Sequence, residues 1–285
     1  MLERGTLYVC ATPIGNLADV TFRVLDVLRK ADLIAAEDTR HSRKLLQHYD
    51  IHTPMVSYHE HNEKSRALEL LAKLQAGLAV ALISDAGTPG ISDPGYVIVN
   101  LCREHGLPVD VLPGPNAAVT ALILSGLPAD RFAFLGFCQG KISERRRRVE
   151  EYAQIPMTHI YYEAPHRLAA LLAEMAKVYG ERPAAVVREI SKLHQQVHQG
   201  TLPELAAEFA LQRPRGECCI VVGAYAKQSR LGTPDEWRAA AEKKIERGIP
   251  SSVAMKETAQ EFDVSKRAVY QAVLDGKKKE DVASS

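Results

Sequence analysis

Short apolar runs alternate with segments of helical periodicity along the first 125 residues of the chain. In the segment 20–31, for example, Val20, Val24, Val27 and Leu28 fall on one stripe of a helix. The alternation predicts a mostly parallel sheet with helices on both faces. The strands are expected at 6–11, 32–36, 55–58, 79–84 and 109–112, and the helices at 20–31, 41–49, 63–75, 96–105 and 116–124.

The pattern changes after a Gly/Pro turn at 125–130, which we interpret as a domain boundary. The second half predicts an α+β domain with antiparallel pairing. Its strands are expected at 132–137, 159–163, 184–190, 195–200 and 218–224, and its helices at 144–152, 168–179 and 205–211. The predicted organisation is therefore an α/β domain over 1–125, an α+β domain over 126–226 and a small C-terminal helical segment over 227–285.

The C-terminal segment begins with a polar linker, 227–234, and then shows helical patterns without strand signals. Residues 256–270 resemble a helix-turn-helix, with Asp263 at the turn position that needs a positive φ. Ala259 is expected at the helix crossing. The segment carries 12 Lys and Arg against 10 Asp and Glu. This balance is low for a DNA-reading domain, so a structural cap or an RNA-positioning appendage is at least as good an interpretation.

Composition narrows the class of protein without identifying a partner. Hydrophobic residues make up 46% and charged residues 25% of the chain, and the net charge is +1. Any nucleic-acid surface would therefore have to be a local patch. No secretion signal or membrane-length apolar run is evident, which predicts a cytoplasmic protein. The five cysteines show no C-x-x-C pair and are expected to be buried thiols, with no metal site.

Three loops follow predicted strands of the first domain: 11–17, 84–95 and 112–118. In open parallel sheets, ligands bind beyond the carboxyl ends of the strands. Glycine permits close backbone approach and proline fixes loop shape, so three such loops favour a ligand site. None has the spacing of a phosphate-binding loop. Asp85, at the start of the second loop, suits a ligand with amine, hydroxyl or cationic groups.

Charged clusters follow three other predicted strands, at 36–42, 161–167 and 188–192. Asp38 or Thr39 could cap a helix, or the first cluster could act in chemistry. His166 could be a base or a residue of a first helical turn. Arg188 and Lys192 could hold phosphates or form an exposed, ion-paired strand end. The sequence leaves each of these alternatives open.

Together these segments resemble the ribosomal RNA small subunit methyltransferase I family of the tetrapyrrole methylase superfamily. The similarity lies in six segments and runs in order from about Leu7 to Tyr225. The segments are 12–17, 36–40, 84–89, 113–115, 162–167 and 188–189. The resemblance implies 2′-O-methylation of a cytidine ribose in the decoding region of 16S rRNA, within the small ribosomal subunit, by a homodimer that uses S-adenosylmethionine.

The resemblance also implies two α/β domains of tetrapyrrole methylase type, with the methyl donor bound in the cleft between them. The expected donor-binding residues lie in the three loops and after a strand of the second domain: Pro13, Gly15, Asp85, Ala86, Gly87, Thr88, Asn116, Ala117, Ala118 and Tyr162. Asn116-Ala117-Ala118 departs from the Thr-Ser that relatives commonly carry, which favours backbone contacts there.

No catalytic base can be carried over from the family. A ribose hydroxyl is a weak nucleophile, so a carboxylate or histidine would help by removing its proton. The candidates are Glu37, Asp38, Glu163 and His166. The candidates for RNA binding are Arg40, Arg145, Arg146, Arg167, Arg188 and Lys192. Two other hypotheses remain: a small-molecule methylase acting on a tetrapyrrole-like metabolite, and a ligand-sensing regulator that binds DNA.

Overall fold

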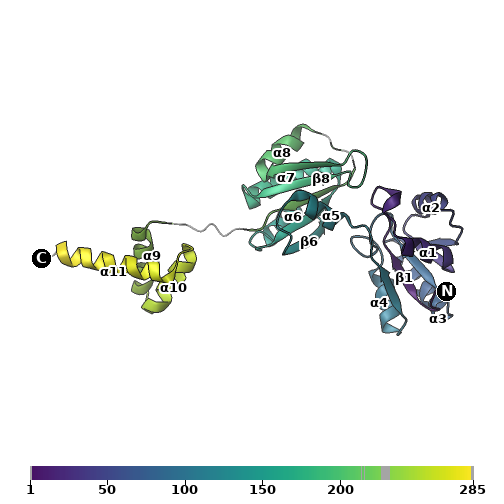
Figure 1. Cartoon of the computed structure of the whole chain (residues 1–285), viewed down its shortest axis with the longest axis horizontal. Helices are drawn as coiled ribbons and strands as arrows, with labels where there is room; N and C mark the ends of the chain where they lie inside the picture. Colours follow the sequence, from purple (N-terminus) through teal and green to yellow (C-terminus); the bar gives the residue numbers. More distant parts are fainter. Residues whose placement is uncertain (1, 213, 215, 226–231, 284–285) are drawn as a thin grey trace. The chain divides into compact units, whose positions relative to one another are not determined.

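The computed structural model describes residues 2–212, 214, 216–225 and 232–283. The chain divides into two compact units, Met1–Tyr225 and Ala226–Ser285, and each is described by itself (Figure 1). The expected linker, 227–234, lies outside the described residues over 227–231.

A five-stranded sheet with the order β3-β2-β4-β1-β5 forms the first half of the larger unit, and all its pairings are parallel. The parallel sheet predicted from the alternating pattern is confirmed. Its strands are β1 (Leu7–Cys10), β2 (Leu33–Ala36), β3 (Met55–Ser57), β4 (Val80–Ile83) and β5 (Val109–Leu112). The helices are α1 (Phe22–Lys30), α2 (Thr39–His48), α3 (Glu63–Gln75), α4 (Tyr96–Glu104) and α5 (Ala117–Ser125), with a 3-10 turn at Leu17–Asp19.

Two hydrophobic cores cover the two faces of this sheet, as the unbroken apolar strands require. Tyr8 and Cys10 of β1 face the core that α1 and α2 close, whereas Leu7 and Val9 face the core under α3 and α4. The expected placement of helices on both faces is thus confirmed. With both faces covered, the strand ends and their loops are the part of the sheet left free to bind a ligand.

A second five-stranded sheet has the order β6-β7-β10-β8-β9. Its pairings are antiparallel except for β6 with β7, which is parallel, so the expected antiparallel pairing holds for the other strands. The strands are β6 (Phe132–Phe137), β7 (Thr158–Glu163), β8 (Pro183–Arg188), β9 (Gln196–Thr201) and β10 (Cys218–Val222). The helices are α6 (Ile142–Glu151), α7 (Pro165–Tyr179) and α8 (Leu202–Leu211).

Helix α5 links the two halves of the larger unit. Its buried residues Ala118, Ala121 and Leu122 pack against Val187 of β8 and Val221 of β10, in the second sheet. The helix therefore comes before the boundary predicted at 125/126 but contributes its buried face to the second half. The loop that leads into it, after β5, is held close to the second sheet as a result.

Three helices form the smaller unit: α9 (Pro234–Glu246), α10 (Ser251–Glu261) and α11 (Lys266–Ala283). Ala259, Val269 and Val273 are buried in its core, and Val264 packs against it. Asp263 has a φ of +52° in the turn between α10 and α11. These details agree with the expected helix-turn-helix shape.

His159 of β7 is a histidine buried in the second half of the larger unit, and its burial predicts how stability depends on pH. It is fully buried beside Tyr161 and Tyr179, and neither ring nitrogen has a hydrogen-bond partner among the described residues. Burial, and secondarily the Arg182 guanidinium, lower the pKa of His159 to about 4. An unfolded histidine takes up its proton near pH 6.5, so the unfolded state binds more protons between pH 6.5 and 4.

We therefore expect the free energy of unfolding to fall by up to roughly 3 kcal/mol as pH drops through that interval. Urea denaturation of the wild type and of His159→Phe at several pH values measures it, and the variant should lose most of the slope. His52→Phe, at an exposed histidine, is the matched control. An unchanged slope in His159→Phe would show that other groups cause the acid sensitivity.

Candidate functional site

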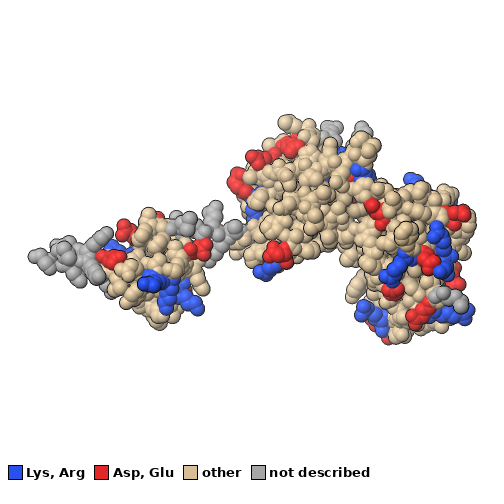
Figure 2. Space-filling view, in the orientation of Figure 1, with Lys and Arg blue, Asp and Glu red and all other residues tan. Residues whose placement is uncertain are grey.

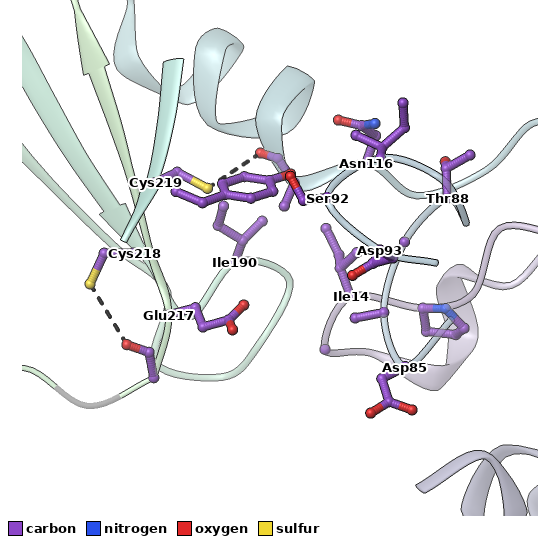
Figure 3. Close-up of a pocket in the computed structure, with 18 of the residues that line it drawn as sticks. Ile14, Asp85, Thr88, Ser92, Asp93, Asn116, Ile190, Glu217, Cys218 and Cys219 are labelled. Carbon is purple, nitrogen blue, oxygen red and sulfur yellow. Dashed lines mark hydrogen bonds between the residues drawn. The ribbon is translucent and has the colours of Figure 1, made fainter. Parts of the chain in front are cut away.

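A cavity of about 560 Å³ lies at the carboxyl ends of the strands of the first sheet, between them and the second sheet. Loops from both halves of the larger unit line it (Figure 3). The first half contributes Pro13, Ile14, Gly15, Glu37, His41, Asp85, Ala86, Gly87, Thr88, Ile91, Ser92, Asp93, Asn116 and Ala117. The second half contributes Phe137, Tyr162, Glu189, Ile190, Lys192, Gly216, Glu217, Cys218 and Cys219.

Backbone hydrogen bonds join the loops after β1 and β4. The Thr12 amide donates to the Gly87 carbonyl at 2.8 Å, and the Gly87 amide donates to the Thr12 carbonyl at 3.0 Å. The buried Thr12 hydroxyl also donates to the Ser84 carbonyl at 3.0 Å. These bonds fix the two loops against each other, so the shape of the cavity is set before a ligand binds.

Two carboxylates join the loops after β2 and β4 in a reciprocal way. The Asp38 amide donates to Asp85 Oδ1 at 3.1 Å, and the Asp85 amide donates to Glu37 Oε2 at 3.1 Å. Each of these bonds uses one oxygen of the carboxylate and leaves the other oxygen outside the contact between the loops. Asp85 therefore has a role in loop structure in addition to facing the cavity.

Two glycines allow close approach at the cavity wall. Gly87 has a φ of +83°, and a Cβ there would lie 3.6 Å from Ile14 Cγ2. At Gly15 a Cβ would lie 2.8 Å from the Ile190 carbonyl oxygen and 2.7 Å from Lys192 Cγ. Gly15 is thus where the first half of the unit touches the loop after β8, and any larger residue would push the two apart.

Three residues other than glycine adopt left-handed backbone conformations in the loops around the cavity. They are Ser92, with φ of +65°, Glu189, with φ of +52°, and Ser191, with φ of +65°. The Ser191 hydroxyl donates to Asp19, which ties the loop after β8 to the 3-10 turn of the first half. Such conformations cost free energy and persist where the surrounding structure holds them, commonly at binding sites.

The cavity is rich in carboxylates. The negative charge of Glu217 acts on both Glu37 and Asp93. Figure 3 shows Asp93 and Glu217 reaching into the cavity from opposite sides. Burial and then the charges of Glu37 and Glu217 raise the pKa of Asp93 to about 7. Burial also raises the pKa of Glu37. Glu189 pairs with Lys192 at 3.1 Å. The excess of carboxylates favours a cationic ligand.

Most of the predicted donor-binding residues meet at this one cavity. The loops after β1, β4 and β5 contribute as expected, and Tyr162 reaches it from β7. Of the predicted set, only Ala118 is absent from the lining, because it is buried in the contact between α5 and the second sheet. Among the catalytic and RNA-binding candidates, Glu37 and Lys192 line the cavity.

Glu163, His166 and Arg167 do not line the cavity. The Glu163 side chain is fully buried and accepts a hydrogen bond from Arg167 Nε at 2.7 Å. His166 lies in the first turn of α7, which is the structural one of the two roles that the sequence left open for it. Among the described residues, Glu163 and Arg167 form an internal ion pair at the start of this helix.

The other candidates also lie outside the cavity lining. Asp38 is the N-cap of α2, and its partly exposed carboxylate pairs with Arg40 at 3.0 Å, which lowers the pKa of Asp38 to about 2. Arg188 donates to Gln196 at 2.7 Å. On α6, Arg145 donates to the Gly140 carbonyl at 2.9 Å and Arg146 pairs with Glu150 at 3.0 Å.

Sequence reasoning assigned no role to several residues that line the cavity, above all Asp93 and Glu217. Asp93 lies in the same Gly/Pro loop as Asp85. The Asp-Pro-Gly sequence that ends this loop is typical of a turn, which could have indicated that the end of the loop returns to the cavity. Glu217 precedes an apolar strand, where a carboxylate is usually a solvent-exposed end. Cys218 and Cys219 were expected to be buried thiols, and all five cysteines are buried and unpaired.

No group of three or more His, Cys, Asp or Glu side chains among the described residues is arranged to hold a metal ion. The helices in the described part of the chain include none long and apolar enough to cross a membrane.

Comparison with known proteins identifies the family. A model of the Tetrapyrrole (Corrin/Porphyrin) Methylases matches residues 6–206. The chain is 46% identical over 273 residues to ribosomal RNA small subunit methyltransferase I of Synechocystis sp., covering 95% of this chain and 98% of that protein. It is 42% identical to the Bacillus subtilis protein of the same name, covering 95% of this chain and 94% of that one.

Solved structures share the fold at lower identity. Uroporphyrin-III C-methyltransferase from Thermus thermophilus, complexed with S-adenosyl homocysteine, aligns with a TM-score of 0.55 and 20% identity, over 76% of this chain and 97% of that one. Diphthine synthase aligns with a TM-score of 0.61 and 14% identity, over 76% of this chain and 89% of that one. The chain belongs to the ribosomal RNA small subunit methyltransferase I family of the tetrapyrrole methylases.

Proposed function

We propose that the chain transfers a methyl group from S-adenosylmethionine to the ribose 2′-hydroxyl of a cytidine in the decoding region of 16S rRNA. The observation that carries this proposal is the identity of 42–46% with ribosomal RNA small subunit methyltransferases I over nearly the whole chain. The relatives' name gives the small-subunit RNA as the substrate class. The target atom and nucleotide are the finer part of the proposal.

The cavity suits this donor. Tetrapyrrole methylases use S-adenosylmethionine, whose sulfonium supplies an activated methyl group and a positive charge. Glu37 and Glu217 offer complementary charge, and the loop at Gly87 leaves room for a ligand beside the backbone. A cavity of about 560 Å³ falls in the range of small-molecule sites. Ile14, Ile190 and Phe137 supply apolar surface.

The RNA would approach the cavity from its open side. Lys192 is the RNA-binding candidate that lines the cavity, and its pairing with Glu189 leaves it half-exposed. The arginines of α6 and the exposed Arg40 are other candidates for phosphate contacts. Arg167 contributes less in this proposal, because its guanidinium is engaged with the buried Glu163.

The helical unit is proposed to position the RNA and to take no part in donor binding. It forms a compact unit of its own. Figure 2 shows basic side chains gathered on one side of it. Its small charge excess would assist docking more than supply most of the affinity.

Deletion of residues 226–285 is therefore expected to leave donor affinity unchanged within about twofold and to slow methylation of small ribosomal subunits by about tenfold or more. Calorimetry with the donor and a transfer assay on subunits measure the two effects. Lys266→Glu with Arg267→Glu should act in the same direction more mildly, with a larger effect at low salt. A truncated chain that methylates subunits at the full rate would eliminate the positioning role.

A homodimer in the cytoplasm completes the proposal. Figure 2 shows a broad area without charged side chains across the middle of the first unit. On α5, Val119 and Ile123 lie one turn apart and are 47% and 68% exposed. Exposed apolar side chains such as these two commonly lie in subunit interfaces. Sedimentation of Ile123→Lys tests this surface, and an unchanged dimer would place the interface elsewhere.

The transfer assay tests the proposed activity. Purified chain and donor labelled in the methyl group are incubated with small ribosomal subunits, with free 16S rRNA and with duplex DNA. We expect the labelled methyl group in the RNA of the small subunits or in the free 16S rRNA. The labelled RNA should resist alkaline cleavage at one position, because a methylated 2′-hydroxyl cannot attack the neighbouring phosphate. Binding of duplex DNA without transfer would favour a ligand-sensing regulator, and transfer only to a tetrapyrrole would favour a small-molecule methylase.

A further inference from the structure

The loop after β4 ends in a short, rigid segment that carries Asp93 into the cavity. The segment closes on itself, since a Cβ at Gly95 would lie 2.9 Å from the Gly90 amide nitrogen. Ser92 is held with a φ of +65°, and Pro94 restricts the backbone on the other side. The Gly95 amide donates to Glu63 Oε1 at 2.9 Å, which anchors the segment to α3. These contacts therefore hold the backbone that carries the Asp93 carboxylate in place at the cavity wall.

The carboxylates around Asp93 have different roles. Glu37 accepts the Asp85 amide, and Asp85 accepts the Asp38 amide, so both are engaged in joining two loops. Glu189 is paired with Lys192. Glu217 lines the cavity from the second half and has no hydrogen bond or ion pair among the described residues. Asp93 differs from these carboxylates because it lines the cavity on a backbone segment that is held in place on both sides.

We propose that Asp93 is the general base that takes the proton from the substrate hydroxyl, with Glu217 facing it across the cavity. This inference rests on the proposed methyl transfer and adds a residue to it. The hydroxyl O–H bond breaks and the proton passes to an Asp93 carboxylate oxygen. The substrate hydroxyl oxygen, which has lost this proton, forms a bond to the methyl carbon while the carbon–sulfur bond breaks. The sulfur keeps that electron pair and becomes a neutral thioether.

The electrostatics of the cavity agree with this role. Burial and the charges of Glu37, Glu217 and Asp85 raise the pKa of Asp93 to about 7, while the Ser84 hydroxyl acts in the opposite direction. A base with a pKa near the working pH is both ionised and able to accept a proton. The other titratable groups that line the cavity are His41, Tyr162, Glu189, Lys192, Cys218 and Cys219.

Asp93→Asn tests the proposal, because it keeps size and removes the proton-accepting charge. We expect methylation of small subunits to slow by about 100-fold or more, with donor affinity by calorimetry within about threefold of wild type. Asp93→Glu should recover part of the rate. Asp130→Asn, at an exposed aspartate, is the matched control and should behave as wild type.

The pH dependence separates a base from a structural residue. The pH–rate profile of the wild type is expected to have an acidic limb, in which the rate falls tenfold for each pH unit below the pKa of Asp93, because only the ionised carboxylate accepts a proton. The positive charge of the bound donor lowers this pKa, so the limb should begin at or below pH 7. Glu217→Gln removes a like charge, so it should move the limb to lower pH. Asp93→Asn should abolish the limb.

Three outcomes would overturn the role of Asp93. An active Asp93→Asn enzyme with an unchanged limb would show that another group takes the proton. Loss of donor binding together with activity in this variant would show that Asp93 serves the donor. A wild-type chain that transfers no methyl group to any RNA would overturn the proposed function and this role with it.

Discussion

Gly87→Val is expected to lower the affinity for S-adenosylmethionine by about tenfold or more while the protein still folds. Gly87 lines the cavity with a φ of +83°, and its backbone bonds to Thr12 hold two loops together. A β-branched residue is strained at this φ, at a cost of about 1–3 kcal/mol. Its methyl groups would also occupy space beside Ile14, where the ligand is proposed to bind. Calorimetry with the donor measures the affinity.

Gly77→Val is the matched control. Gly77 follows α3 with a φ of +89°, and a Cβ there meets nothing within 4 Å. The two variants should therefore lose similar thermal stability from backbone strain, but only Gly87→Val should lose the donor. If both variants bind the donor like wild type, the donor site lies elsewhere.

Arg167→Gln is expected to destabilise the larger unit by about 2–3 kcal/mol. The substitution leaves the Glu163 carboxylate, whose side chain is fully buried, without its ion-pair partner. Breaking a buried pair on one side costs about 3–5 kcal/mol, and we reduce this figure because the Arg167 side chain is 28% exposed. Urea denaturation measures the loss.

Two comparisons separate this internal role from RNA binding. Arg147→Gln, at an exposed arginine of α6, should cost little stability. Glu163→Gln combined with Arg167→Gln should be less destabilised than Arg167→Gln alone, since no charge is left buried without a partner. Normal stability with weakened methylation in Arg167→Gln would instead support an RNA contact.

Local pattern was sufficient for most of the fold. Strands β1 and β4 are continuous apolar runs, and α1 has a clear buried stripe, so their type and order followed directly from periodicity. Helix α5 was less informative, because its sequence is apolar on most sides and does not reveal which sheet it covers. The parallel pairing of β6 with β7 follows from the helix α6 between them, a strand–helix–strand signal that the expectation of antiparallel pairing overlooked.

The same limit applies to the site. Loops that follow β1, β4 and β5 meet because parallel strands end at one edge, which the sequence pattern predicts. Glu217 reaches the cavity only through the arrangement of the second sheet, so no spacing in the sequence indicates it. Glu163 and Arg167 are four residues apart, a spacing typical of an ion pair, and the structure shows this pair in place of the expected catalytic and RNA-binding roles.

Mapping of ribose methylation on the 16S rRNA of a strain that lacks this chain tests the central claim most directly. We predict that one cytidine 2′-O-methyl group in the decoding region is missing and that the wild-type chain restores it. Asp93→Asn, expressed at the same level, should not restore it. A methylation pattern identical to that of the parent strain, with no site lost, would contradict the account.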